Sequence, residues 1–238
     1  MPTRILSISG LRGVIGDGLE PEYLSRFARA LGRLVDGGSV VISRDGRASG
    51  LMVREAVLAG LAAEGCLVFD AGICSTPTCG FLVRQREAAA GLQITASHNP
   101  AEWNGLKPFN ASGRVFSAVE GQRLIELIDT VATPMLDTVD GADVEPVALP
   151  GEAHLERVLS LVDVEVIRRR AVRVVLDANH GTMQFVRLVD KFNVTERFPE
   201  LMALGQAQPD QTVGVEAASL LIRRKQLPLI RSALQAAD

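Results

Sequence analysis

The sequence QITASHNP, residues 93–100, joins the end of an apolar run to a short polar turn. The apolar run covers residues 89–95, a length that is typical of a buried strand. Asn99-Pro100 favours a turn directly after it. We therefore expect Ser97 and His98 at the end of a strand, where a hydroxyl and an imidazole can face a pocket.

Helical and strand-like segments alternate on both sides of this stretch. Apolar residues at helical spacing predict helices, which cover residues 21–35, 51–64, 118–131 and a shorter segment through 81–84. Short apolar runs predict strands, which cover residues 39–43, 66–70 and 89–95. This alternation is typical of the α/β class, and it predicts a mixed, mostly parallel sheet covered by helices.

Polar loops follow the three predicted strands. They cover residues 44–50, 71–77 and 97–105. In sheets of this kind, the loops beyond the carboxyl ends of the strands carry the chemistry. We therefore expect the functional residues of this chain in these three loops.

A stretch of prolines and aspartates with little periodicity interrupts the alternation. We therefore predict a first α/β domain over residues 1–135, a linker over 136–150, and a partial or divergent second α/β domain over 151–238. A helix over 152–162 and a strand over 172–177 would open the second domain.

Charge and composition narrow the class of partner. The formal net charge is −3, and Lys and Arg form no dense cluster. Surfaces that bind nucleic acid or anionic membranes depend on clustered positive charge, so we expect neither partner and favour a small molecule. No apolar run approaches the roughly 20 residues of a membrane span. Cys66, Cys74 and Cys79 lack the spacing of a zinc site, so we expect buried thiols in a reducing cytoplasm.

Two other interpretations of residues 95–100 stay open from the residues alone. Ser97 and Asn99 could serve only turn hydrogen bonds, with His98 as a surface residue. A serine hydrolase is the second alternative, but the G-x-S-x-G elbow is absent. Ser97 and His98 are also sequence neighbours, and neighbours in an extended segment point to opposite sides, which makes a direct pair of nucleophile and base awkward.

The segment TASHNP, residues 95–100, resembles the phosphoserine signature of the α-D-phosphohexomutases, which include phosphomannomutases, phosphoglucomutases and phosphoglucosamine mutases. Other matches follow in the order that this family uses: GLRG at 10–13, SRDGRASG at 43–50, DAG at 70–72 with STP at 75–77, and WNGLK at 103–107. The resemblance covers the first predicted domain, and VVLDANHG at 174–181 is similar to the opening of the family's second domain.

The resemblance implies an intramolecular phosphotransferase that interconverts hexose 1-phosphates and 6-phosphates through a phosphoserine at Ser97. A phosphoserine carries roughly −1.5 to −2 charge, and it needs cations and fixed donors around it. The implied catalytic residues are Ser97, Lys107, His98 and Arg12. Lys107 is the favoured acid or base, and His98 either orients the phosphate or supports the loop. The implied substrate-binding residues are Asn99 and Asn104.

The segment SRDGRASG is expected to have a different role. R-D-G-R suits a tight turn with internal ion pairs. We therefore expect Arg44, Asp45 and Arg47 to shape the neighbouring loop rather than to touch substrate.

The family holds Mg²⁺ between the phosphoserine and three aspartates of a D-G-D-x-D-R segment in its third domain. The resemblance therefore implies Mg²⁺ as the cofactor and Ser97 as a metal ligand. No D-G-D-x-D-R segment occurs in this sequence. Asp137, Asp140 and Asp143 recur at every third position of the predicted linker, and we interpret them as solvated charge.

Two functions are therefore compared. The first is a phosphohexomutase, truncated and weakly active or inactive alone, or dependent on a partner chain for the missing metal and phosphate loops. The expected partners are hexose phosphate and either such a partner chain or further copies in a homo-oligomer. The second is a non-catalytic remnant of that family that binds sugar phosphate or serves an interaction role. Without metal ligands and a distal phosphate clamp, little transition-state charge is neutralised, which favours the second for the isolated chain.

Overall fold

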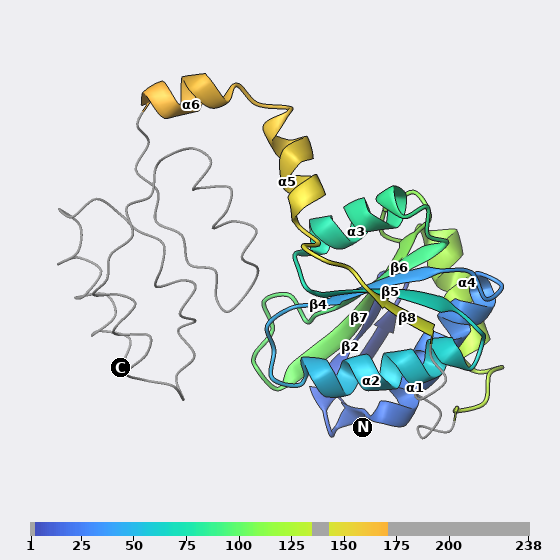
Figure 1. Ribbon diagram of the computed structural model, residues 1–238. Coiled ribbons are helices and arrows are strands. Elements are labelled where there is room, and N and C mark those ends of the chain that lie inside the picture. Colours follow the sequence, from blue (N-terminus) through green and yellow to red (C-terminus); the bar gives the residue numbers. More distant parts are fainter. Residues whose placement is uncertain (1–2, 135–142, 171–238) are drawn as a thin grey trace, which may run out of the picture. The chain divides into compact units, whose positions relative to one another are not determined.

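The structure is a computed structural model that describes residues 3–134 and 143–170 (Figure 1). The chain divides into two compact units, Met1–His154 and Leu155–Asp238. The strand predicted at 172–177 lies outside the described residues.

The first unit alternates strands and helices along most of its length. Its strands are β1 (Arg4–Ser7), β2 (Gly10–Ile15), β3 (Gly18–Leu19), β4 (Val40–Arg44), β5 (Leu67–Ile73), β6 (Ala90–Ile94), β7 (Trp103–Asn110) and β8 (Asp143–Pro146). Its helices are α1 (Pro21–Leu34), α2 (Gly50–Ala62), α3 (Thr76–Gln85) and α4 (Ala118–Ile128). Helix α5 (Glu152–Leu159) begins at its end, and α6 (Val164–Arg170) follows in the second unit.

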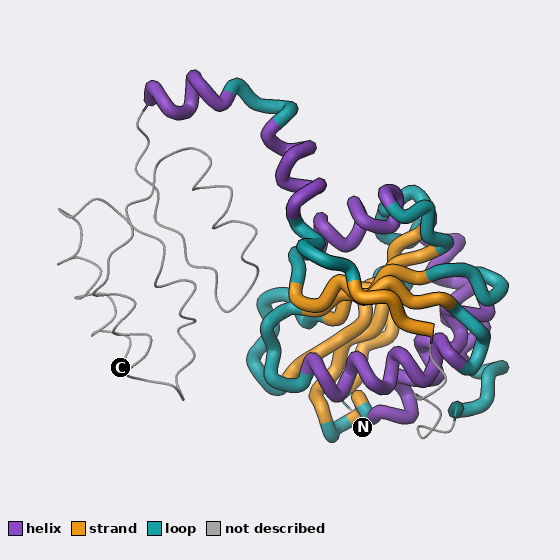
Figure 2. The backbone as a smooth tube through the Cα atoms, viewed as in Figure 1, coloured by secondary structure: helices purple, strands orange, loops and turns teal. Residues whose placement is uncertain are grey.

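The strands, orange in Figure 2, form one mixed sheet. Their order is β1-β2-β7-β6-β4-β5-β8, and β3 pairs with β2. The pairs β4–β6, β4–β5, β5–β8 and β2–β3 are parallel. The pairs β1–β2, β2–β7 and β6–β7 are antiparallel. The α/β class and the mixed sheet covered by helices are therefore confirmed.

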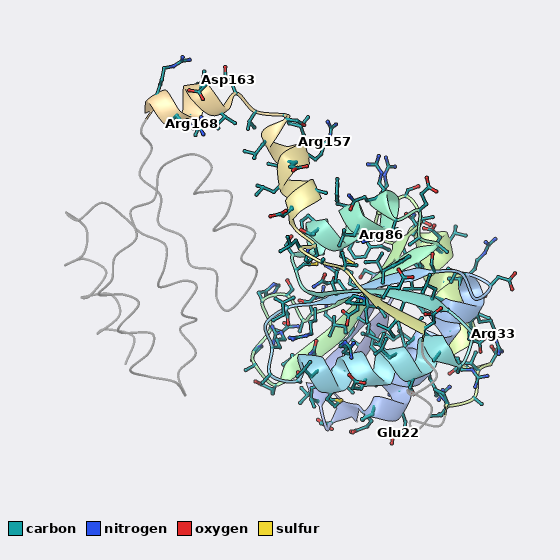
Figure 3. All side chains as sticks on the ribbon, viewed as in Figure 1. Glu22, Arg33, Arg86, Arg157, Asp163 and Arg168 are labelled. Atoms are coloured by element: carbon teal, nitrogen blue, oxygen red, sulfur yellow. The ribbon has the colours of Figure 1, made fainter. Side chains whose placement is uncertain are left out.

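Helices cover both faces of this sheet, with α1 and α2 on one side and α3 on the other (Figure 1). Successive side chains of β4 point to opposite faces of the sheet. Val40 and Ile42 belong to the larger core, and Val41 belongs to the smaller core beneath α3. Charged side chains stay outside these cores: Glu22 and Arg33 project from the exposed side of α1 (Figure 3). The two layers leave the carboxyl ends of β4 and β6 free to carry loops.

The helices predicted at 21–35, 51–64 and 118–131 are confirmed as α1, α2 and α4, with small shifts at their ends. Strands β1, β2, β3 and β7 were not predicted. The β7 sequence WNGLKPFN contains glycine and proline, which disfavour strands. Pro108 is tolerated because the pairing of β7 with β2 ends at Leu106, so the side of β7 facing β2 needs no amide donor there.

The first unit extends beyond the boundary expected at residue 135. Strand β8 lies inside the expected linker and pairs with β5, so that interval supplies an edge strand of the sheet. His154 stacks on Phe81 of α3 with ring centroids 5.1 Å apart, and its Nδ1 lies 2.9 Å from the Thr78 hydroxyl. The first turn of α5 is thereby attached to α3.

No helix among the described residues is long and apolar enough to cross a membrane.

The three cysteines are free and buried, as expected. Burial raises the pKa of the Cys66 and Cys74 thiols to about 11 and that of Cys79 to about 12. We predict that alkylation of the native chain at pH 8 is about a hundredfold slower than that of an unfolded thiol, because each pKa unit removes about nine tenths of the reactive thiolate. The measurement is to stop the alkylation at a series of times and follow the intact mass. The rate for the native chain is compared with that for the urea-unfolded chain.

The same pKa values predict a loss of stability at alkaline pH. The unfolded thiols ionise near 9.0, whereas the buried ones hold their protons to about 11 or above. The unfolded state is therefore favoured progressively as the pH rises above about 9, and the thiols contribute no pH dependence well below that value.

The control for the alkylation experiment is a Ser112→Cys variant, whose exposed thiol should react at the rate of an ordinary thiol. Native thiols that react as fast as this control would contradict the burial.

Candidate functional site

Ser97 lies in the turn that follows β6. Its side chain is exposed, whereas the neighbouring Ala96 is buried and anchors the turn to the sheet. The backbone of Ser97 is left-handed, with φ of 59°, which is uncommon for a residue with a side chain. The Ser97 amide donates to the Thr95 hydroxyl at 3.0 Å. The turn thus presents the Ser97 hydroxyl to solvent, at the end of a strand as the sequence predicted.

The position of His98 corrects one expectation. The Ser97 hydroxyl lies 3.3 Å from Nδ1 of His98, so the two side chains are on the same side of the chain. The expectation of opposite sides assumed an extended segment, and the left-handed backbone of Ser97 removes that assumption. The hydroxyl and the imidazole are therefore close enough to exchange a proton.

Asp45 connects the loop after β4 to the turn that bears Ser97. Its carboxylate accepts hydrogen bonds from the Thr95 hydroxyl at 2.7 Å, from the Arg47 amide at 3.1 Å and from Nε of Arg47 at 3.1 Å. Thr95 in turn accepts the Ser97 amide. A continuous chain of hydrogen bonds therefore runs from Asp45 through Thr95 to Ser97. The sequence analysis gave Thr95 no role of its own, although it stands two residues before the serine.

Arg47 contacts the same turn from its other side. Its guanidinium donates to the backbone carbonyls of Ser97, Asn99, Pro100 and Trp103. The prediction that this segment shapes the neighbouring loop is therefore confirmed for Arg47 and Asp45. The Arg44 guanidinium, by contrast, donates to the carbonyl of Asp45, at 3.3 Å.

Strand register places Arg12 and Lys107 on one face of the sheet. Arg12 pairs with Gly105 across β2 and β7, and Lys107 pairs with Gln93 across β7 and β6. Residues two apart in a strand share a face, so the side chains of Arg12 and Lys107 project from the same side. Leu11 and Leu106, their neighbours in sequence, are buried in the larger core on the opposite face. Both cations are half-buried on the face covered by α3.

Gly105 allows the backbones of β2, β7 and the residue after β6 to come close together. The Thr95 amide donates to the Gly105 carbonyl at 3.0 Å, which extends the pairing of β6 with β7 to the base of the turn. A Cβ atom on Gly105 would lie 2.3 Å from the carbonyl oxygen of Leu11 and 3.0 Å from that of Thr95. Only glycine fits there without movement of the strands. The glycine of the N-G-x-K segment therefore brings the backbone of β2 at Leu11 and Arg12 close to Thr95 at the base of the Ser97 turn, and Lys107 follows two residues later, opposite Gln93.

The structure gives the two asparagines supporting contacts. Asn104 is fully buried; its Nδ2 donates to the Ser49 hydroxyl at 2.9 Å and its Oδ1 accepts the Gly105 amide at 2.8 Å. Its side chain is thus enclosed by protein, and the expectation that it contacts substrate stays a prediction. Asn99 is half-buried, and its carbonyl is held by Arg47.

The described residues hold no preformed cluster of metal ligands, so the expected Mg²⁺ stays a prediction. Mg²⁺ takes about six oxygen ligands in a compact octahedron. Within residues 3–134 and 143–170, no group of three or more His, Cys, Asp or Glu side chains could hold a metal ion. Ser97, the expected ligand, offers a single hydroxyl oxygen. Of the aspartates interpreted as solvated charge, Asp143 is exposed, and Asp137 and Asp140 lie outside the described residues.

A shallow polar depression lies away from this site. It is lined by Arg84, Glu87, Ala88, Ala111, Ser112 and Arg114. Arg84 is in the last turn of α3, and the other residues follow α3 or β7, so the depression lies near the beginning of β6, at the opposite end of that strand from Ser97. The chemistry-bearing residues are thus gathered at the carboxyl end of β6 rather than in this depression.

Comparison with known proteins identifies close relatives of this arrangement. The family model described as phosphoglucomutase/phosphomannomutase, alpha/beta/alpha domain I, matches residues 4–135. A probable phosphoglucosamine mutase of Methanopyrus kandleri is 38% identical over 179 residues, which are 75% of this chain and 38% of that protein. A phosphoglucosamine mutase of Limosilactobacillus fermentum is 35% identical over 200 residues, covering 78% of this chain and 42% of that protein.

Solved structures agree with this comparison. The crystal structure of a putative phosphomannomutase from Thermus thermophilus matches with a TM-score of 0.62 and 29% identity, covering 71% of this chain and 38% of that one. A phosphoglucomutase from Paramecium shares the fold with a TM-score of 0.63 at 16% identity. The chain thus spans about two fifths of the length of the curated relatives it matches.

Proposed function

This chain belongs to the phosphoglucomutase/phosphomannomutase family, and we propose that it provides the phosphoryl-carrying serine of a hexose phosphate mutase. Ser97 accepts a phosphoryl group from a hexose 1,6-bisphosphate and returns one to a hexose monophosphate. The observation that carries the proposal is the exposed Ser97 hydroxyl, which stands on a turn whose amide and carbonyl are both held by hydrogen bonds.

Each transfer exchanges one oxygen–phosphorus bond for another. As Oγ of Ser97 bonds to phosphorus, the bond from phosphorus to the sugar oxygen breaks. The serine proton passes to a base, and the departing sugar oxygen takes up a proton. Positioning and charge neutralisation supply most of the catalysis in phosphoryl transfer.

Two groups are candidates for the proton steps. His98 places Nδ1 3.3 Å from the Ser97 hydroxyl, so it can accept the serine proton directly. Lys107 stands opposite Gln93 on the same face of the sheet as Arg12. We assign Lys107 to proton exchange with the sugar oxygen, and Arg12 to the charge of the transferred group, because an arginine stays protonated and binds phosphate oxygens as a planar fork.

A second function is non-catalytic. Within residues 3–134 and 143–170, no group of three or more His, Cys, Asp or Glu side chains could hold a metal ion. A chain of this kind would bind sugar phosphate, or join a partner chain or a second copy, without turnover of its own. Loading of Ser97 without mutase turnover is the result expected from it.

The test is to incubate the purified chain with hexose 1,6-bisphosphate and measure its intact mass. We expect a gain of one phosphoryl group. Digestion with trypsin gives a peptide over residues 87–114, in which Thr95, Ser97 and Ser112 are the hydroxyl residues, and fragmentation should place the phosphate on Ser97. A coupled mutase assay with Mg²⁺ then separates the two functions. A chain that gains no phosphate, or gains it on another residue, would overturn the proposal.

A further inference from the structure

The guanidinium of Arg47 is surrounded by the carbonyls of the Ser97 turn. Nη1 donates to the Pro100 carbonyl at 2.6 Å and to the Trp103 carbonyl at 2.9 Å. Nη2 donates to the Asn99 carbonyl at 2.7 Å and to the Ser97 carbonyl at 3.1 Å. The side chain is 13% exposed. Both terminal nitrogens are therefore engaged by the backbone of one turn.

Such a turn needs a donor of this shape. The carbonyls of residues 97, 99, 100 and 103 converge on one point, and their partial negative charges repel each other unless a donor group lies between them. A guanidinium presents five N–H groups in a fixed plane, whereas an ammonium presents three around a single nitrogen. Lysine at this position would keep the charge and lose the fork.

The Ser97 backbone is held on both sides. Its amide is fixed by Thr95 and its carbonyl by Arg47. The left-handed conformation costs free energy in a residue with a side chain, and it persists when the surrounding contacts over-determine it. These contacts also direct the Ser97 side chain outward, next to His98.

We propose that Arg47 is the positioning residue of the phosphoryl-accepting serine: it holds Ser97 in the left-handed conformation that presents its hydroxyl, without touching the transferred group. The catalytic part of this inference rests on the proposed function of Ser97. The structural part, that Arg47 fixes the turn, stands on the hydrogen bonds alone and is tested separately.

The first test uses Trp103, which is the single tryptophan of the chain and whose carbonyl Arg47 binds. In Arg47→Lys, quenching of Trp103 fluorescence by acrylamide should rise about twofold or more, because a turn released from its donors opens locally more often. Arg29→Lys is the matched control. Arg29 is also partly buried and donates to a carboxylate and a carbonyl, those of Glu64 and Ala132, but both lie far from the turn in sequence. It should leave the quenching at the wild-type value.

The second test measures the rate at which hexose 1,6-bisphosphate phosphorylates Ser97. Arg47→Lys should lower this rate about a hundredfold, which is the scale of loss when a reacting group is displaced by about 1 Å. Arg29→Lys should retain the wild-type rate. A merely structural role would lower the thermal stability of both variants alike and spare the rate after correction for folded fraction.

The two tests fail separately. If the wild-type chain gains no phosphate, the proposed function fails, and the Trp103 measurement still decides whether Arg47 fixes the turn. If Arg47→Lys keeps wild-type quenching and loading, the inference on Arg47 is overturned. Should Arg47→Lys not fold, Asp45→Asn weakens the alignment of the arginine while retaining it, and it should slow loading about tenfold. Wild-type loading and quenching in Asp45→Asn would overturn the inference as well.

Discussion

Replacement of Ser97 by alanine is expected to abolish phosphate incorporation from hexose 1,6-bisphosphate, together with any mutase turnover of the chain. The hydroxyl is the atom that bonds to phosphorus, so no other contact of the turn can replace it. Thr95 is two residues away in the same turn, but its hydroxyl donates to Asp45 and accepts the Ser97 amide. The intact mass of the variant should therefore stay at the unmodified value.

The control for this variant is Ser112→Ala. Ser112 is exposed and falls in the same tryptic peptide, but it lies near the beginning of β6, away from the turn. Its removal should leave both the incorporated mass and the fragmentation pattern unchanged. Because Ser97 is exposed, alanine there should alter the free energy of unfolding by no more than about 0.5 kcal/mol. Phosphate that persists in folded Ser97→Ala would show that another group is the acceptor.

The fold could be predicted from the sequence where periodicity is strong. In α1, apolar residues recur at helical spacing and Gly37 follows the end, and both signals correspond to the observed helix. In β7, the features that conceal the strand are those that serve the site. Gly105 is required by the close approach of Leu11 and Thr95, so a residue that lowers strand propensity is there for packing.

The candidate site could be predicted only in part. The residue types indicate which chemistry is possible, but they do not determine the backbone conformation that orients the side chains. Ser97 was expected at the end of β6, and it is there. Its left-handed φ of 59° could not be expected, because serine has no preference that requires it. That single angle reverses the expected relation between Ser97 and His98. The burial of Asn104 could not be predicted either, because its contact with Ser49 depends on how the loop after β4 meets β7.

The contacts of Arg47 explain how the loop after β4 supports the loop after β6. Asp45 and Arg47 come from the first loop, and the atoms that they bind belong to Thr95, Ser97 and the following residues. Strands β4 and β6 are parallel neighbours, so their carboxyl ends meet at the same edge of the sheet. The parallel pairing of β4 with β6 therefore places the loop that carries Asp45 and Arg47 against the turn that carries Ser97. The first loop contributes no reacting group and fixes the shape of the second.

Replacement of Lys107 by methionine is the second change with a large expected effect. Methionine keeps most of the length and the apolar stem and removes the ammonium group. We expect the rate of phosphate loading on Ser97 to fall about a hundredfold or more, because general acid–base catalysis typically contributes factors of this size. The measurement is the time course of the intact mass at saturating hexose 1,6-bisphosphate. Arg114→Met removes an exposed cation at the other end of the β6–β7 pair and should keep the wild-type rate.

Lys107→Arg separates the two contributions that the lysine can make. Arginine keeps the positive charge at this position of β7, but it does not release a proton in proteins. If Lys107 exchanges a proton with the sugar oxygen, Lys107→Arg should be nearly as slow as Lys107→Met. If Lys107 only neutralises phosphate charge, arginine should restore most of the rate, since arginine binds phosphate well. A wild-type rate in Lys107→Met would contradict both roles, and it would leave His98, with Nδ1 3.3 Å from the Ser97 hydroxyl, as the group that moves the proton.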